Sequence, residues 1–103
     1  MKTKQETLQN NRVVEVVNMS KCKDFGTIEG DVRIDRATKW GNPYHISKTC
    51  SRKKSIELYE FHFVFNLLKD IEELKDARRL GCWCAPLACH GDVIKRYLGK
   101  CGL

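Results

Sequence analysis

Residues 79–99 constrain the fold more than any other part of this chain, because a short strand there runs through a tight turn into an amphipathic helix. Residues 79–84 fit an extended strand, and the apolar residues of 91–99 recur at helical spacing. Strand–turn–helix units build open α/β sheets, in which ligands bind beyond the carboxyl ends of the strands. We therefore expect an α/β fold with a functional site in residues 84–92.

The N-terminal half supplies two further strands. Four valines in residues 12–18 predict a strand covered on both faces, and the alternation of residues 31–35 predicts a second one. Residues 36–50 have no clear period, and a loop of that length in a small domain is usually functional.

Helices are expected after this loop. Ser51 can cap a helix whose buried stripe is Ile56, Tyr59, Phe63 and Leu67. A further short helix is expected at residues 70–77. More apolar residues broaden the stripe, so we expect the longer helix to be well covered; they are Phe61, Val64, Phe65 and Leu68.

The chain of 103 residues is expected to form one α/β domain over residues 12–103, after a flexible leader at residues 1–11. The expected architecture is a small Rossmann-like sheet of about three or four strands flanked by helices. The polar N-terminus shows no secretory signal and no apolar run is long enough to span a membrane, so a cytoplasmic location is expected.

A net charge of +6 favours anionic partners, such as nucleotides, phosphates or nucleic acid. A mildly basic, solvated surface would give the same charge. One basic cluster opens the expected long helix, where cations are unfavourable to the helix dipole; it comprises Lys48, Arg52, Lys53 and Lys54.

Residues 82–92 read Cys-Trp-Cys-Ala-Pro-Leu-Ala-Cys-His-Gly-Asp, and this density of reactive side chains favours a site. Cys89 is expected near a helix N-terminus, where the dipole favours a thiolate, and His90 can transfer protons near neutral pH. Asp92 can orient His90 or bond the backbone. We expect Cys89, His90 and Asp92 to act on a bound anion; buried thiols that serve only packing are the structural alternative.

A zinc site is a second alternative for the same segment. Its ligands would be Cys82, Cys84, Cys89 and His90, with the thiolate and imidazole donors that zinc prefers. The spacing of these four residues differs from that of the paired ligands in typical structural zinc sites. If Cys89, His90 and Asp92 instead act on a bound anion, no cofactor is expected. Disulfides are less expected, because no signal directs the chain to an oxidising compartment.

Residues 39–45, Lys-Trp-Gly-Asn-Pro-Tyr-His, form the other unusual segment. Gly-Asn-Pro is a turn signal, and the tryptophan can either stack on a base or fill the core. The expected ligand-binding residues are Asn18, Arg36, Lys39, Trp40, Gly41, Asn42 and Pro43. We expect this turn and the cysteine-rich turn to meet in one pocket.

These motifs resemble an uncharacterised family of bacteria and bacteriophages, the domain of unknown function 4326. The resemblance lies in Val16-Val17-Asn18, Ile34-Asp35-Arg36, Trp40 to Pro43, Leu58-Tyr59, and Cys82 to Asp92, which follow in that order. Asp35 stands where the family pattern has glycine. The resemblance implies a shared site for the two segments and no particular activity.

The expected function is binding of, or catalysis on, a nucleotide, nucleoside or other phosphate-bearing molecule, with transfer or hydrolysis as the expected reaction if the protein is an enzyme. The alternatives are a zinc-stabilised nucleic-acid-binding module without catalysis, which the basic cluster favours, and a bacteriophage accessory protein that binds a host protein.

Overall fold

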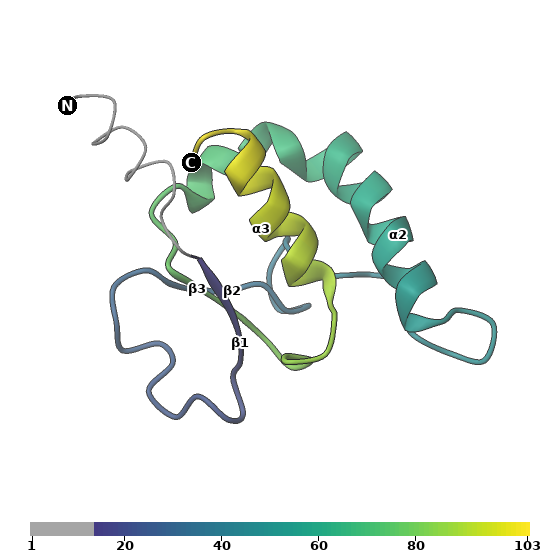
Figure 1. Ribbon diagram of the computed structural model, residues 1–103, viewed down its shortest axis with the longest axis horizontal. Helices are drawn as coiled ribbons and strands as arrows, with labels where there is room; N and C mark the ends of the chain where they lie inside the picture. The colour runs from purple at the N-terminus through teal and green to yellow at the C-terminus, as the bar shows by residue number, and fades with distance from the viewer. Residues whose placement is uncertain (1–13) are drawn as a thin grey trace.

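The computed structural model describes residues 14–103, and the expected leader lies outside them. The elements in chain order are β1 (Glu15–Asn18), β2 (Asp31–Arg33), α2 (Arg52–His62), η1 (Phe63–Leu67), η2 (Leu68–Leu74), β3 (Arg79–Cys82) and α3 (His90–Lys100). The segment η1 is a π-helical turn and η2 a 3-10 helix, and together they continue α2 toward β3 (Figure 1). Ser51 caps α2 as expected, since its Oγ accepts the N–H of Lys54 at 3.1 Å.

The three strands form one parallel sheet in the order β1-β3-β2, which confirms the α/β class. Val16, Leu80 and Val32 lie in one row across it, and Leu80 in the central strand is fully buried. Helix α3 packs against β1, and α2 lies beside α3 (Figure 1). Val16 is only partly buried because β1 is an edge strand, so the expected cover on both faces is incomplete.

A loop, not a helix, covers the other face. Gly81 in the central strand faces Met19 and Phe25, and a Cβ atom at Gly81 would lie 2.5 Å from the Phe25 ring. Glycine at this position leaves room for the Met19 and Phe25 side chains directly on the strand, and a larger side chain would make them shift.

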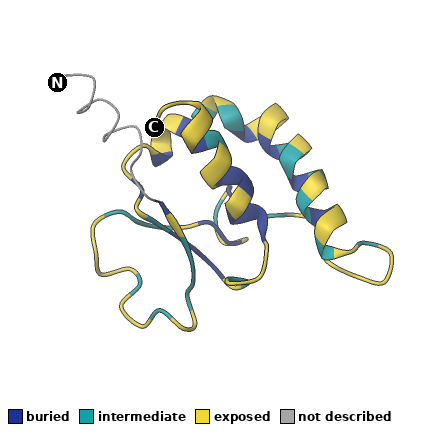
Figure 2. Cartoon of the chain, in the orientation of Figure 1, coloured by how far each residue is buried: buried dark blue, intermediate teal, exposed yellow. Residues whose placement is uncertain are grey.

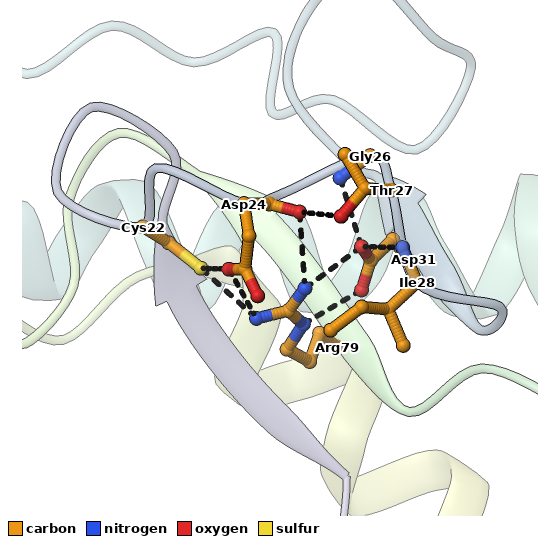
Figure 3. Close-up of polar contacts among 7 residues, drawn as sticks. All are labelled: Cys22, Asp24, Gly26, Thr27, Ile28, Asp31 and Arg79. Carbon is orange, nitrogen blue, oxygen red and sulfur yellow. Dashed lines mark hydrogen bonds and ion pairs between the residues drawn. The ribbon is translucent and has the colours of Figure 1, made fainter.

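Arg79 fixes this loop to the sheet (Figure 3). Its guanidinium pairs with Asp31 through Nε, at 2.6 Å, and reaches Asp24 at 3.1 Å and the Cys22 sulfur at 3.0 Å. The Asp31 carboxylate also accepts the backbone N–H of Gly26, at 2.8 Å. These contacts hold the pKa of Asp31 well below its usual range, Arg79 having the largest effect. The loop is thus ordered by charge-assisted hydrogen bonds rather than by regular structure.

Helix α2 and η1 are covered on one side only. Tyr59, Phe63 and Leu67 are buried, as the apolar stripe predicts. The expectation that the helix is well covered is wrong, because Phe61 and Phe65 are 66% and 77% exposed. The helix contacts α3 on its inner side, and its outer side faces solvent in the described part of the chain (Figure 2). No helix within residues 14–103 combines the length and the apolar character needed to cross a membrane.

Candidate functional site

A pocket of about 280 Å³ lies where three segments meet: the turn after β2, the start of α2, and the turn from β3 to α3. Parallel strands direct β2 and β3 toward the same edge of the sheet, so the residues that follow them converge there. The structure therefore brings together the two segments singled out in the sequence. The lining residues are Asp35, Arg36, Asn42, Tyr44, His45, Ile46, Arg52, Ser55, Ile56, Cys82, Trp83, Cys84, Ala88, Cys89 and His90.

Cys89 and Asp92 form the N-terminal cap of α3. The Cys89 sulfur accepts the N–H of Gly91 at 3.3 Å, and the Asp92 carboxylate accepts the N–H of Cys89 at 3.0 Å. Asp92 is exposed and does not line the pocket, so of its two expected roles the structure shows the bond to the backbone. Cys89 lines the pocket but is 97% buried, with only 3% of its surface exposed.

His90 is the first residue of α3, and a hydrogen bond of its imidazole ring fixes the side chain in place. Its Nε2 lies 2.6 Å from the carbonyl oxygen of Ile34, which fixes Nε2 as the donor because a carbonyl can only accept. The edge of Tyr59 packs against the imidazole, with ring centroids 5.0 Å apart. Burial lowers the pKa of His90, so the ring is neutral near pH 7 and Nδ1 carries a lone pair.

Cys82 and Cys89 form a close thiol pair in the pocket wall, with their sulfur atoms 3.6 Å apart. The Cys82 sulfur also accepts the N–H of Cys84, at 3.4 Å. Hydrogen bonds from Cys89 and from the backbone lower the pKa of Cys82, whereas the same contact and burial raise that of Cys89. The expected thiolate at Cys89 is therefore not favoured, and of the two thiols Cys82 has the lowered pKa.

The expected zinc ligands do not form a site. Within residues 14–103, no three histidine, cysteine, aspartate or glutamate side chains are arranged to hold a metal ion. His90 in particular uses Nε2 on the Ile34 carbonyl. All six cysteines are free thiols.

Trp40 fills the core, which was one of its two expected roles. The Trp40 side chain is 5% exposed, and its ring centroid lies 6.3 Å from that of Phe63. Neither face of the indole is therefore free to stack on a base. The expectation of stacking is therefore wrong for this residue. Lys39 also points away from the pocket, because its ammonium pairs with Asp70 at 3.2 Å and Glu73 at 2.9 Å.

Asn42 shapes the turn on which it lies. Its amide donates to Ser55 Oγ at 2.9 Å, its side-chain oxygen accepts the N–H of Tyr44 at 2.8 Å, and its backbone oxygen accepts from Arg36 Nε at 2.8 Å. Asn42 and Arg36 line the pocket, whereas Gly41 and Pro43 are not among its lining residues. The expected direct bond from the Asn42 amide to a ligand would have to compete with Ser55.

Asn18 supports the cysteine-rich turn from the end of β1. Its amide nitrogen donates to the carbonyl oxygens of Trp83 and Ala85, both at 3.1 Å. It does not line the main pocket but a second, open hollow beside Pro86. Its contribution to the site is therefore to hold the turn in place.

Trp83 and Arg52 are two of the lining residues that the sequence did not single out as ligand contacts. Trp83 is 55% exposed, and its indole Nε1 donates to Asp35 Oδ2 at 3.0 Å. Arg52 donates to the carbonyl oxygen of Ala88 at 3.0 Å and so joins the start of α2 to the turn before α3. The sequence did contain a signal that Arg52 has a function. Arg52 belongs to a basic cluster at the start of a helix, where positive charge is unfavourable to the helix dipole.

Asp35, the departure from the family pattern, thus has a defined role. It is 8% exposed, forms an ion pair with Arg33 and accepts the indole N–H of Trp83. The ion pair with Arg33 is the main reason why the pKa of Asp35 is lowered. The carboxylate fixes the direction of an aromatic ring at the rim of the pocket.

The family model for "Domain of unknown function (DUF4326)" matches residues 17–100, which include every segment that builds the pocket. The chain belongs to this family. It is also similar to the "Uncharacterized 12.4 kDa protein in nrdA-td intergenic region" of Enterobacteria phage T4, at 36% identity over 96 residues, covering 86% of this chain and 81% of the phage protein. No solved structure matches the chain.

Proposed function

We propose that this member of the family binds a phosphate-bearing small molecule of the nucleotide class in the pocket between the Asn42 turn and the Cys82–Cys89 turn. The observation that carries the proposal is the combination of two guanidinium groups, Arg36 and Arg52, with the exposed indole of Trp83 around one cavity. Arginine matches the geometry of phosphate, and an exposed aromatic face suits a base.

The charge balance of the lining supports an anionic ligand. Among residues 14–103, the only carboxylate in the lining is that of Asp35, whose charge is already paired with Arg33. Besides the thiols, the remaining ionisable side chains of this lining are Arg36, Tyr44, His45, Arg52 and His90. A phosphate entering the pocket would therefore meet an excess of positive charge.

Size and apolar lining favour a mononucleotide over a larger ligand. The volume of about 280 Å³ lies near the lower end of the range for small-molecule sites. Tyr44, Ile46 and Ile56 supply apolar surface to the lining. A nucleoside monophosphate would place its phosphate near the arginines and its base on the indole.

Calorimetric titration with inorganic phosphate, ribose 5-phosphate and the four nucleoside monophosphates tests the proposal. The expected order is a nucleoside monophosphate above ribose 5-phosphate above phosphate. Arg52→Gln should weaken the best ligand about tenfold or more, as expected for loss of one charged hydrogen bond. Lys53→Gln, which removes the same charge one residue away on an exposed side chain, is the matched control.

Equal weakening by both variants would mean that only net charge matters, and no saturable binding of any of the six compounds would overturn the proposal. Catalysis by Cys89 and His90 stays a prediction; His90 supports it best, because its Nδ1 is not hydrogen-bonded within residues 14–103. Binding of a host protein also stays a prediction.

A further inference from the structure

Cys82 and Cys89 lie seven residues apart in the chain, at the two ends of the turn that joins β3 to α3. Their sulfur atoms are 3.6 Å apart, near van der Waals contact, so a change of side-chain torsion could bring them to bonding distance. We propose that these two residues form a redox-active pair, which a small peroxide converts reversibly into a disulfide. This inference does not depend on which ligand the pocket binds.

The backbone around the pair favours negative charge on sulfur. The N–H of Cys84 points at the Cys82 sulfur, and the N–H of Gly91 points at the Cys89 sulfur. Cys89 also caps the N-terminus of α3, where the helix dipole stabilises an anion. Thiolates are the reactive form of cysteine. The two backbone N–H groups therefore favour attack of one sulfur on a peroxide and the later closure of the disulfide by the other sulfur.

The environments of the two sulfurs assign their order of reaction. Cys82 has the lowered pKa because it accepts hydrogen bonds from the Cys89 thiol and from the backbone. Cys89 keeps its proton, because burial and the neighbouring sulfur raise its pKa. With the N–H of Cys84 directed at its sulfur as well, Cys82 is assigned as the attacking thiolate and Cys89 as the resolving thiol.

Burial selects the oxidant. Cys82 and Cys89 are 1% and 3% exposed, and both border the pocket through which a reagent must arrive. A molecule the size of hydrogen peroxide fits such an approach, whereas a bulky disulfide such as oxidised glutathione would need the turn to open. The pair should therefore discriminate between the two oxidants.

The reaction balances in two steps. The Cys82 thiolate attacks one peroxide oxygen, the O–O bond breaks, and the released hydroxide takes a proton, leaving Cys82 as a sulfenic acid and forming water. The Cys89 sulfur then attacks the Cys82 sulfur as its own proton leaves, the S–O bond breaks, and a second water departs. In total, two thiols and one hydrogen peroxide give one disulfide and two waters.

The test treats the full, reduced chain with one equivalent of hydrogen peroxide, alkylates the remaining thiols, and measures intact mass and fragment spectra. The expected result is loss of two of the six thiols, with a linkage between Cys82 and Cys89 that dithiothreitol reverses. Oxidised glutathione should react much more slowly. Further oxidation without a disulfide, or a linkage that involves Cys84, would overturn the proposal.

Variants separate the two roles. Cys89→Ser keeps an N-cap side chain, since serine is a good cap, and should stop at a Cys82 sulfenic acid, seen as the gain of one oxygen atom at Cys82 in the fragment spectra. Cys84→Ser is the matched control in the same turn and should still form the disulfide. Gain of the oxygen atom at Cys84 or Cys101 in place of Cys82 would refute the assigned order. The wild-type mapping holds even if a variant fails to fold.

Discussion

Gly41 lies directly against the backbone of Arg36, so closely that a Cβ atom at Gly41 would be 2.5 Å from the Arg36 Cα and 2.7 Å from the carbonyl oxygen of Asp35. The contact closes the turn that carries Asn42 onto the end of β2. Arg36 and Asn42 reach the pocket together because of it, and the hydrogen bond from Arg36 Nε to the Asn42 carbonyl seals the same turn.

Gly41→Ala should therefore destabilise the protein by about 1–3 kcal/mol, the usual cost of overpacking, because backbone atoms cannot move aside as a side chain can. Gly99→Ala is the control, since nothing lies within 4 Å of that position in α3 and alanine favours a helix by up to about 1 kcal/mol. Urea denaturation measures both. Equal stability of the Gly41 variant and the wild type would contradict the close contact.

The two tryptophans should behave in opposite ways. Trp40→Ala removes a buried ring beside Phe63 and should cost about 3–5 kcal/mol of unfolding free energy. Trp83→Ala, at a ring 55% exposed, should cost less than about 1 kcal/mol but should weaken binding of a nucleoside monophosphate. Denaturation and calorimetry together check this. If removal of Trp83 left the affinity unchanged, the base would not stack there.

Tyr59→Phe should destabilise the chain by about 1–2 kcal/mol. The Tyr59 hydroxyl donates to the carbonyl oxygen of Trp40 at 2.7 Å in the core, and its loss leaves that buried acceptor without this donor. Tyr44→Phe is the control, because Tyr44 is only half-buried and its backbone makes its hydrogen bonds in this region. Thermal denaturation at one pH compares the pair, and an equal shift in both variants would refute the role of the buried bond.

His90 should make stability depend on pH. Its pKa is lower in the folded chain, chiefly through burial, than the value near 6.5 of an unfolded histidine. The unfolded state then binds more protons as the pH falls below about 6.5, so the free energy of unfolding decreases there, by at most ~1.4 kcal/mol per pH unit. Urea denaturation between pH 7.5 and 5.5 measures this slope.

His90→Gln should flatten that pH dependence, because glutamine has no proton to gain. A histidine titration followed by NMR gives a second measurement. A His90 midpoint at or above that of an unfolded histidine would contradict the assignment.

Local patterns in the sequence were sufficient to predict where the main strands and helices lie. The valines of β1, the cap at Ser51 and the stripe of Tyr59 and Phe63 each act through near neighbours in the chain, so the α/β class was predictable. The motif Cys82 to Asp92 also marked the correct turn. The cover of Phe61 and Phe65 was not predictable, because it depends on whether another element packs on the outer side of α2.

By itself, the sequence determined which segments are extended or helical and that the Trp-Gly-Asn-Pro and cysteine-rich turns are special. Only the tertiary structure decided which tryptophan enters the core and which stands at the pocket, because the two differ in distant partners rather than in local pattern. Trp40 packs against the ring of Phe63 and accepts a hydrogen bond from Tyr59 on its backbone oxygen. The indole of Trp83 instead donates to Asp35 and stays at the surface. The 3.6 Å contact of Cys82 with Cys89 likewise exists only once β3 and α3 have packed.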